Sequence, residues 1–409
     1  MQTIEQQLDM LMRGVEYGDP QTYINMRQEL KERLELSAKT GKPLRVYCGY
    51  DPTSPDLHLG HTVTMRKLRQ FQELGHQVVF VIGNYTALIG DPSDKDKARP
   101  RPTNAQIEAN ARTYQEQAFK ILDGAKTEVR YNGEWLSQLT FENLINLASN
   151  FTIQQFLVRD NFAKRLERND PVWLHELFYA LMQGYDAVML EADVQLGATE
   201  QLFNLMAGRK LQEVYGQLPQ IAITLPILVG TDGHIRMSKS IGNYIGISEP
   251  PEVMYGKTMS IPDEAMSNYL NLITRWTPEQ IAEIEAKLHA GAIHPMEVKK
   301  QLAWEIVDIF YGSEAAEGAA EHFARVHQQR ELPDDMPVFQ LTEPIRLVDL
   351  LHQAGIAGSK SDARRLVQQG GVRLGADAAT NVVTDVDYVI PVADAILQVG
   401  KRRFLHLVP

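Results

Sequence analysis

The chain has a single cysteine, Cys48, among its 409 residues. One thiol cannot form a disulfide framework or a thiolate zinc site within one chain, and such low cysteine use is typical of a reducing compartment. The sequence also lacks an apolar run long enough to span a bilayer, and its first residues have no apolar signal segment. These absences predict a cytoplasmic protein with no membrane partner.

Positive charge is also in short supply. The chain has 41 Lys and Arg against 52 Asp and Glu, a net charge of −11, which argues against a protein coated by nucleic acid over its whole surface. The deficit is uneven, because Glu343–Pro409 contains eight Lys and Arg against seven Asp and Glu. This shift in charge is a first indication that the C-terminal stretch has a partner of its own.

Short apolar runs alternate with stretches of helical spacing along the first 230 residues. The runs at 44–49, 77–83, 127–132, 193–197 and 221–230 predict buried strands, and the stretches at 57–74, 104–122, 174–190 and 200–215 predict helices. Residues 1–40 also read as helical. Strands that alternate with helices predict an α/β fold with a parallel sheet, which a helical insertion at about 135–175 would split.

The rest of the chain has a different pattern. Residues 248–326 are almost wholly helical by pattern, and the polar, Pro-bearing stretch 327–337 is a candidate linker. A final unit from about Glu343 begins with two helices. Short strands follow them at 371–374, 388–392, 396–400 and 402–407. At the usual domain size, this length predicts two to three domains.

The stretch CGYDPTSPDLHLGH, residues 48–61, joins the first predicted strand to the first helix of the α/β region. Ligands bind at the carboxyl ends of parallel strands, where helix N-termini attract anions. His58 and His61 would share a face of the first helical turn and could donate hydrogen bonds to a phosphoryl group, with Gly60 leaving room for a nucleotide. A capping role and a zinc pair are the alternatives, although no further ligand follows at a zinc-binding spacing.

Two loops that follow predicted strands carry basic residues. The loop IGDPSDKDKARPRP, 89–102, offers Lys95 and Arg99, which could bind phosphates or simply be solvated. The loop GTDGHIRMSKS, 230–240, offers Arg236 and Lys239 beside Ser240. The chain has no GxxxxGK[ST] motif, so it is not a P-loop NTPase.

A polar stripe lies on the predicted helix 174–190. Tyr179, Gln183 and Asp186 are spaced so that they share one helical face. A helix packed on a sheet normally turns an apolar stripe inward, so this stripe faces either solvent or a small polar ligand.

HLGH together with RMSKS resembles the paired signature of the class I aminoacyl-tRNA synthetases. The surrounding motifs resemble the bacterial type of tyrosyl-tRNA synthetase over nearly the whole chain: YCGYDPTSPDLHLGH, GDPSxKxxxR, NxxW at Asn132 and Trp135, YxxxQxxD and QxGxxxQ. The resemblance implies a Rossmann-like catalytic domain at 1–246 with an insertion that forms a homodimer interface. It also implies an α-helical anticodon-recognition domain at 247–335 and an S4-like RNA-binding domain, small and α+β, at 341–409.

The resemblance also implies roles for individual residues. The tyrosine site would comprise Tyr47, Asp91, Tyr179, Gln183, Asp186 and Gln201. The ATP site would comprise Gly49, Asp51, Gly60, Gln195, Gly197, Glu200 and Lys239. Catalytic groups around the phosphates would be His58, His61, Thr53, Lys95, Arg99, Arg236, Lys239 and Ser240. The stretch SKSDARRLVQQGGVRL, 359–374, resembles the S4 motif, so Ser359, Lys360, Arg364 and Arg365 would bind tRNA.

The implied reaction joins L-tyrosine to tRNA(Tyr) through a tyrosyl-adenylate, with ATP as its Mg²⁺ complex and no tightly bound cofactor or resident metal. Three positions depart from the usual family pattern: Ala198 and Glu200 stand in GATEQ where GGSDQ or GGTDQ is common, and Arg236 replaces a lysine. The rivals are a tryptophanyl enzyme of the same fold, an RNA-binding protein without catalysis, and a zinc hydrolase that uses His58 and His61.

Overall fold

The computed structural model describes residues 2–93, 102–328, 336–375, 381–400 and 403–409. Contacts divide the chain into two compact units, one running to Ala316 and the other from Glu317 to Pro409. The predicted boundary between residues 246 and 247 lies inside the first unit, so the α/β region and most of the helical region that follows form one compact body.

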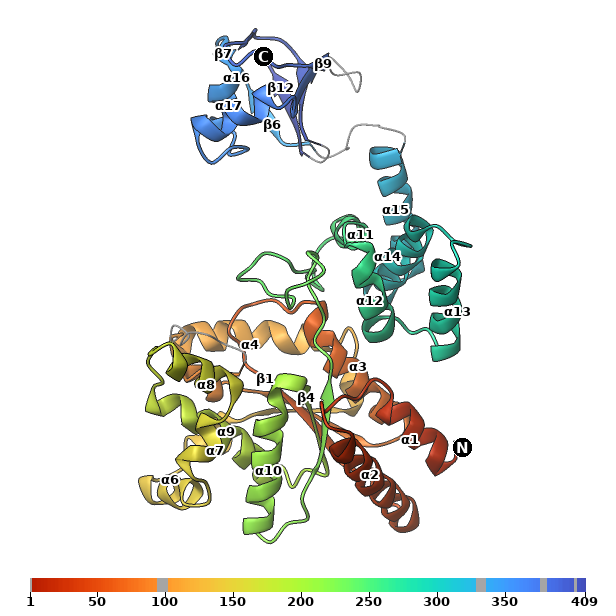
Figure 1. The fold of residues 1–409 in the computed structure, drawn as a ribbon, viewed down its shortest axis with the longest axis vertical. Coiled ribbons are helices and arrows are strands. Elements are labelled where there is room, and N and C mark those ends of the chain that lie inside the picture. The colour runs from red at the N-terminus through yellow and green to blue at the C-terminus, as the bar shows by residue number, and fades with distance from the viewer. Residues whose placement is uncertain (1, 94–101, 329–335, 376–380, 401–402) are drawn as a thin grey trace. The chain divides into compact units, whose positions relative to one another are not determined.

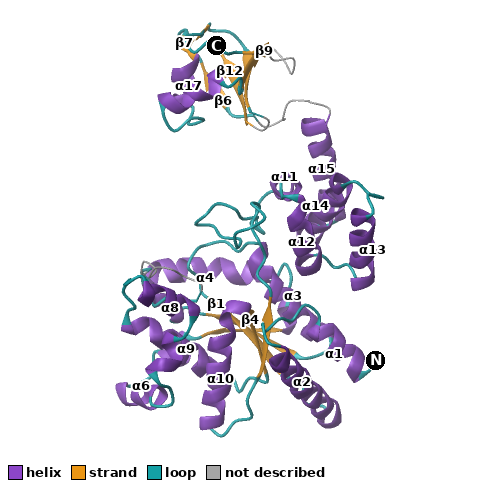
Figure 2. Cartoon of the chain, viewed as in Figure 1, coloured by secondary structure: helices purple, strands orange, loops and turns teal. Residues whose placement is uncertain are grey.

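The first unit is built on a parallel sheet. In the described part of this unit the sheet has five strands in the order β3-β2-β1-β4-β5. They are β1 (Arg45–Tyr50), β2 (Gln77–Ile82), β3 (Thr127–Tyr131), β4 (Val194–Ala198) and β5 (Ile221–Leu225). Figure 2 shows these orange strands between purple helices on both sides. The direction of strand order reverses between β1 and β4, which is where Rossmann-like sheets bind ligands. The predicted α/β fold is confirmed.

The helices of the α/β region cover the sheet on both sides (Figure 1). They are α1 (Ile4–Met12), α2 (Pro20–Thr40), α3 (Leu59–Glu73), α4 (Asn104–Ala118), α9 (Leu174–Met189) and α10 (Leu202–Val214). Short 3-10 turns occupy η1 (Thr86–Leu88), η2 (Gly124–Lys126) and η3 (Thr199–Gln201). The insertion between β3 and α9 is helical as expected, with α5 (Gly133–Leu136), α6 (Phe141–Ala148), α7 (Ile153–Leu157) and α8 (Asp160–Glu167).

The ends of α3 and β5 show how the sequence sets the limits of an element. Helix α3 ends at Glu73, and Gly75 has a φ of 87°, a left-handed conformation that glycine adopts without strain. The predicted strand at 221–230 is too long, because β5 ends at Leu225. Pro226 follows, and proline has no N–H with which to extend the hydrogen bonding of this edge strand to β4.

The helical region after the sheet contains α11 (Pro251–Met259), η4 (Asp263–Ala265), α12 (Met266–Ile273), α13 (Pro278–His289), α14 (Pro295–Tyr311) and α15 (Ser313–Phe323), and it ends in a π-turn, η5 (Ala324–Gln328). The pattern at 248–326 therefore predicted this region correctly. The proposed linker falls largely on residues 329–335, which lie outside the described residues.

The second unit packs two helices against a sheet. The helices are α16 (Leu347–Gln353) and α17 (Lys360–Gln368), and the described sheet has the order β6-β12-β11-β8-β9. Its strands are β6 (Val338–Gln340), β8 (Val372–Gly375), β9 (Asn381–Val382), β11 (Ala395–Val399) and β12 (Arg403–Val408), and β7 (Ile345–Arg346) pairs separately with β10 (Val389–Ile390). Pairing of β6 with β12 places the start of this fold at Val338, earlier than the predicted start at 341. The pattern missed β6 because three residues are too few to show alternation.

Candidate active site

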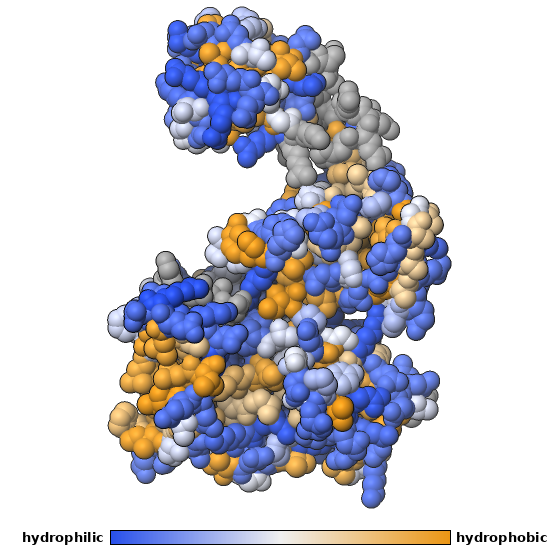
Figure 3. All heavy atoms as spheres, in the orientation of Figure 1, coloured by the Kyte–Doolittle hydropathy of each residue, from blue (hydrophilic) through white to orange (hydrophobic). Residues whose placement is uncertain are grey.

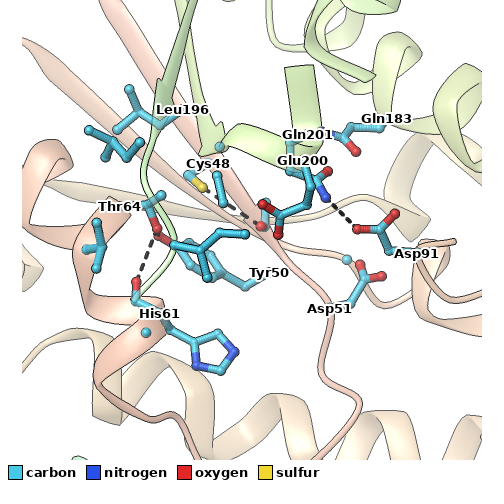
Figure 4. Close-up of a pocket in the computed structure, with 18 of the residues that line it drawn as sticks. Cys48, Tyr50, Asp51, His61, Thr64, Asp91, Gln183, Leu196, Glu200 and Gln201 are labelled. Carbon is cyan, nitrogen blue, oxygen red and sulfur yellow. Dashed lines mark hydrogen bonds between the residues drawn. The ribbon is translucent and has the colours of Figure 1, made fainter. Parts of the chain in front are cut away.

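A cavity of about 230 Å³ opens at the carboxyl ends of β1 and β4, the point where the strand order reverses. Figure 4 shows the surrounding side chains, with Asp51, Asp91, Glu200 and Gln201 drawn around the same space. Most of the site residues inferred from the sequence line this cavity: Gly49, Asp51, Thr53, His58, Gly60, His61, Asp91, Tyr179, Gln183, Asp186, Gly197, Glu200, Gln201 and Arg236. Segments from residue 49 to residue 236 therefore meet in one place, as their order on the sheet requires.

Asp186 on α9 lines the cavity and is 4% exposed. Trp135 Nε1–H donates to its Oδ1 at 2.7 Å, and Asn132 Nδ2–H donates to its Oδ2 at 3.2 Å. Burial raises the pKa of Asp186 to about 8, although these two hydrogen bonds act in the opposite direction. The carboxyl group is thus held rigidly in a dry setting. This also gives the NxxW motif a role that the sequence did not reveal.

Tyr47 and Gln195 are neighbours in the sheet, and neither lines the cavity. Tyr47 is 1% exposed, and burial together with the charge of Asp186 raises the pKa of its phenol well above the usual value. Gln195 is equally buried, and its Oε1 accepts from Gln220 Nε2 at 2.5 Å. The two predicted contacts with substrate therefore stay predictions, and both residues lie in the layer directly beneath the site.

A polar network lies on the side of the cavity formed by α9 and α10. Gln201 Nε2–H donates to Asp91 Oδ2 at 2.5 Å, the contact drawn in Figure 4. Asn204, which is fully buried, donates to both Gln201 Oε1 (3.0 Å) and Gln183 Oε1 (3.1 Å). Asn204 therefore fixes the orientation of two amides that face the cavity. Sequence reasoning missed Asn204, although its place three residues after Gln201 on a helix was a usable signal.

Tyr179 and Asp51 connect this network to the loop after β1. The Tyr179 hydroxyl donates to Asp51 Oδ2 at 3.0 Å, and Thr86 Oγ1 donates to Asp51 Oδ1 at 2.7 Å. The predicted polar stripe of α9 thus faces a cavity and not solvent, because Tyr179, Gln183 and Asp186 all line it.

His58 and His61 form a capping box at the start of α3. His58 Nδ1 accepts from Gly60 N–H, and His61 Nδ1 accepts from His58 N–H, both at 3.2 Å. An imidazole whose Nδ1 accepts is the tautomer that carries its proton on Nε2, so each ring keeps one N–H donor. The capping alternative is therefore correct, and it is compatible with phosphoryl binding because it uses only one nitrogen of each ring.

Both histidines stay neutral over most of the pH range. Burial, together with the charge of Lys239, lowers the pKa of His61 to about 4. Burial and the neighbouring His61 lower the pKa of His58 even more. Among the residues that the structure describes, His, Cys, Asp and Glu side chains form no cluster of three or more able to hold a metal ion.

Gly60 between the histidines has two reasons to be glycine. A Cβ at this position would lie 3.0 Å from two atoms of the His58 ring, so any other residue would disturb the cap. The same missing side chain leaves space in the cavity, which Gly60 lines.

Cys48 also lines the cavity, and burial raises the pKa of its thiol to about 11, so the group stays protonated and is not a nucleophile.

The loop 230–240 is held at its base by Asn243. This residue is 6% exposed, its Nδ2 donates to Arg236 O at 3.1 Å, and its Oδ1 accepts from Ser238 N–H at 2.8 Å. A Cβ on Gly230 would lie 2.1 Å from Asn243 Nδ2, so the close approach requires a glycine there. Asn243 is a second residue that sequence reasoning missed, since an asparagine after a serine-rich loop reads as an ordinary turn residue.

The cations of this loop bind to groups of the site itself. Arg236 Nη1 lies 3.3 Å from Glu200 Oε1, so two of the three departures from the family pattern meet in one ion pair. Lys239 Nζ donates to Ser54 Oγ at 3.1 Å and to the carbonyl oxygen of Asp56. Lys239 and Ser240 do not line the cavity, but Lys239 contacts the loop that does. Lys95 and Arg99 lie outside the described residues.

The predicted tRNA-binding residues lie together in the second unit. Ser359 caps α17, with its Oγ accepting from Asp362 N–H at 3.1 Å. Lys360 pairs with Asp349 at 2.7 Å and Arg365 with Asp362 at 3.0 Å, and both side chains are more than 60% exposed. Arg364 is also exposed. The four residues thus belong to the start of one amphipathic helix and leave three cations accessible.

The family models match almost the whole chain. The model of the class I tRNA synthetases (W and Y) matches residues 39–328, and the model of the tyrosine–tRNA ligase SYY-like C-terminal domain matches residues 328–406. The chain therefore belongs to the class I tRNA synthetases of this type.

Relatives within the class narrow the family further. The chain is 48% identical over 405 residues to the tyrosine–tRNA ligase of Thermotoga maritima, covering 99% of this chain and 98% of that protein. It is 50% identical over 408 residues to the tyrosine–tRNA ligase of Moorella thermoacetica, covering 99% and 96%. The resemblance to bacterial tyrosyl-tRNA synthetases is thereby confirmed.

Solved structures agree on the fold. A tyrosyl-tRNA synthetase of Archaeoglobus fulgidus complexed with L-tyrosine superposes with a TM-score of 0.60 at 21% identity, covering 78% of this chain and all of that one. A C-terminally truncated mitochondrial tyrosyl-tRNA synthetase of Aspergillus nidulans gives a TM-score of 0.60 at 20% identity, covering 80% and 94%.

Proposed function

We propose that the chain is a tyrosine–tRNA ligase that activates L-tyrosine with ATP and transfers the tyrosyl group to the 3′ end of tRNA(Tyr). The observation that carries this proposal is Asp186, a buried carboxyl group that lines the cavity and is held by Trp135 and Asn132. A phenol hydroxyl is the group of tyrosine that can satisfy this position. Phenylalanine would leave the buried polar group without its substrate partner, which is strongly unfavourable.

The amino and carboxylate groups of free tyrosine fit the polar network of Asp91, Gln183 and Gln201. Asp91 offers a carboxylate to the substrate ammonium, and the amides of Gln183 and Gln201 lie beside it. Asn204 does not line the cavity, so its proposed role is to hold these amides in place. A molecule with a phenol at one end and an ammonium at the other therefore has partners at both ends of the cavity.

The first step forms the adenylate. The tyrosine carboxylate attacks the α-phosphorus of ATP, a carboxyl oxygen–phosphorus bond forms, and the bond to the β-phosphate oxygen breaks to release pyrophosphate. No side-chain nucleophile is needed, so the protein contributes positioning and charge stabilisation. The Nε2–H groups of His58 and His61 are suited to the phosphoryl oxygens, and Arg236, Lys239 and Ser240 to the leaving pyrophosphate.

ATP enters as its magnesium complex in this proposal, so the metal belongs to the substrate. The described residues do not gather a cage of ligands for an ion of their own. That is the usual situation for Mg²⁺, which keeps several waters and is held mainly by phosphates. In the second step a hydroxyl of the tRNA terminal ribose attacks the acyl carbon and releases AMP.

The second unit is proposed to grip the tRNA, and the helical region 247–335 to recognise the anticodon. Exposed Lys360, Arg364 and Arg365 on α17 provide cations for phosphate groups. A chain that ends at Gln328, where the class I match ends, should keep pyrophosphate exchange and lose tRNA charging. Intact charging by this shortened chain would contradict the role. Charging by the full chain should weaken as salt rises.

The insertion is proposed to form a homodimer. Figure 3 shows orange side chains gathered over the part of the molecule where α6 to α8 lie. The most exposed of them are Phe141 (78%), Val158 (74%) and Ile153 (61%). Exposed apolar patches of this kind mark protein interfaces. Val158→Asp should convert a dimer to a monomer in light scattering, and a wild-type monomer would refute the proposal.

Among the described residues, no helix has the length and apolar character needed to cross a bilayer. The proposed site of action is the cytoplasm, where tRNA is charged.

Tyrosine-dependent exchange between ATP and pyrophosphate tests the enzymatic proposal. Pure full-length protein should catalyse exchange with tyrosine far faster than with phenylalanine, and should not catalyse exchange with tryptophan. Exchange with tryptophan alone would identify the tryptophanyl rival, and no exchange with any amino acid would favour an RNA-binding protein without catalysis. Activity that disappears on removal of zinc would favour the hydrolase.

A further inference from the structure

Arg159 is a buried cation in the insertion, at the junction of α7 and α8, and it does not line the cavity. It is 9% exposed, and its guanidinium lies 4.7 Å from the ring centre of Phe203 and 5.4 Å from that of Phe162. Its buried Nη1 makes no hydrogen bond with any residue that the structure describes. Removing a guanidinium from water is costly, so a cation placed here requires a compensating function.

A hydrogen bond of this guanidinium points toward the active site. Arg159 Nη2 donates to Ser93 Oγ at 2.7 Å, and Ser93 is 3% exposed. The backbone N–H of Ser93 in turn donates to Asp91 Oδ1 at 2.9 Å. The other oxygen of Asp91 accepts from Gln201 at 2.5 Å. Arg159 is therefore two hydrogen bonds away from a carboxylate that faces the cavity.

A neighbouring residue of the insertion contacts the same segment. Asn161, 7% exposed, donates from Nδ2 to the carbonyl oxygen of Pro92 at 2.8 Å. The segment 91–93 is thus fastened to the start of α8 at Pro92 and at Ser93. The charge of Asp91 also acts directly on Arg159, since it raises the pKa of the guanidinium against the larger lowering caused by burial. The two groups are close enough to stabilise each other electrostatically.

We propose that Arg159 is a positioning residue for the amino-acid ammonium subsite, acting through Ser93 on Asp91. This inference rests on the proposed function, because Asp91 is taken as the partner of the substrate ammonium. Arg159 holds the turn that carries Asp91 and places a positive charge behind it. The insertion then does more than offer an apolar surface: it also builds one wall of the amino-acid site.

Arg165 provides a matched control in the same insertion. It is 1% exposed, and its two terminal nitrogens donate to Glu176 at 2.8 and 2.9 Å. Its hydrogen bonds within the described part of the chain go to Glu176 and Pro171 and not to the segment 91–93, so it stabilises the insertion without reaching the site. Replacing either arginine by methionine removes a buried guanidinium and leaves an unbranched side chain of similar length. Only one of the two replacements should alter binding of the amino acid.

Tyrosine-dependent pyrophosphate exchange by the full-length protein tests this proposal, with KM for tyrosine and KM for ATP measured separately. Arg159→Met should raise KM for tyrosine about tenfold, the usual effect of losing a hydrogen bond to a charged group, and leave KM for ATP within about twofold. Ser93→Ala should act in the same direction, and the double variant should be no worse than Arg159→Met alone. Arg159→Lys should restore part of the tyrosine affinity because it keeps the charge.

Arg165→Met should lower the melting temperature without a selective change in KM for tyrosine. The inference is overturned if Arg159→Met folds and leaves KM for tyrosine unchanged, or if it raises both KM values equally. If Arg159→Met does not fold, Ser93→Ala and Arg159→Lys decide the question, since an unchanged KM for tyrosine in both would refute the link. Failure of the wild-type protein to exchange with tyrosine would refute the proposed function instead, so the two failures are distinguishable.

Discussion

The two ends of the cavity are built differently. At the phenol end, Asp186 comes from a helix packed on the sheet, is 4% exposed, and already accepts two hydrogen bonds from Trp135 and Asn132. At the phosphate end, Arg236 and Lys239 come from a loop and bind to Glu200, Ser54 and Asp56. The end that would select the amino acid is rigid before substrate arrives. The end that would handle pyrophosphate uses cations that must exchange partners.

This difference separates affinity from chemistry. A rigid, dry site gives selectivity, because a wrong side chain leaves polar groups unsatisfied. A loop whose cations are held by weaker, partly exposed contacts can be redirected to charge that develops only in the transition state. Variants at the two ends should therefore change different kinetic constants, and the following predictions are ordered by the size of the expected effect.

The largest effect is expected at the phenol end. Asp186→Ala removes the substrate's acceptor and leaves the Trp135 indole N–H without its partner, while Asn132 keeps its hydrogen bond to Thr86. We expect kcat/KM for tyrosine in pyrophosphate exchange to fall on the order of a thousandfold, since several buried hydrogen bonds are lost together. Exchange with phenylalanine should not fall, because that substrate has no hydroxyl to lose. An equal loss with both amino acids would mean that Asp186 supports the fold and does not select the substrate.

A smaller effect is expected for His61→Asn at the phosphate end. The asparagine oxygen can still accept the capping hydrogen bond of His58 N–H, but no Nε2–H remains for the phosphoryl group. We expect kcat of exchange to fall about a hundredfold with KM for tyrosine within about twofold. His76→Asn is the matched control, because His76 Nδ1 also accepts a backbone N–H, that of Leu44, outside the cavity. A large rise in KM for tyrosine in His61→Asn would contradict the division of roles.

The ion pair between Glu200 and Arg236 should have a modest effect. Glu200→Gln removes the charge that holds Arg236 over the cavity, so we expect KM for ATP to rise about threefold, as is usual for a partly exposed pair. The change should shrink as salt is added. Glu213→Gln, an exposed glutamate on α10, is the control. A Glu200→Gln variant whose KM for ATP is unchanged at low salt would show that the pair does not contribute to ATP binding.

A separate pair of effects concerns stability, and the two ends should respond to pH in opposite directions. The raised pKa of Asp186, about 8, means that the folded protein binds this proton more tightly than the unfolded chain, so its contribution is lost as pH rises toward 8. The lowered pKa of His61, about 4, means that the unfolded chain binds that proton more tightly, so stability is lost as pH falls from about 6.5 to 4.

Denaturant unfolding of matched variants would reveal both slopes. Relative to the wild type, Asp186→Asn should gain stability between pH 5 and pH 8, and His61→Asn should gain stability as pH falls below about 6.5. We expect each difference to be about 1–2 kcal/mol. Parallel pH profiles for the wild type and both variants would show that neither group carries the assigned proton.

Much of this architecture follows from the sequence because it depends on local pattern. The strands and helices of the α/β region have clear periods, and strand order brings Asp51, His58 and Asp186 to one end of the sheet. The predicted strand at 221–230 was too long because apolar residues continue past Pro226. Strand hydrogen bonding stops before that proline, and the apolar pattern does not show this.

What pattern could not provide was tertiary pairing. Asn204 and Asn243 look unremarkable in sequence, and their roles depend on which side chains and backbone groups fold against them. The meeting of Glu200 with Arg236 likewise joins residues 36 apart, and nothing local indicates it. Tyr47 does not line the cavity because of its register on β1, where it lies beside Gln195, and its motif does not reveal this register.

Tyrosine binding without ATP tests the central claim most directly. Calorimetric titration of the wild type, His61→Asn and Asp186→Ala with L-tyrosine alone isolates the phenol end from the chemistry. We expect His61→Asn to bind tyrosine with the Kd of the wild type, and Asp186→Ala to show no measurable binding. Equal weakening in both variants would contradict the separation of the rigid selective end from the phosphate end.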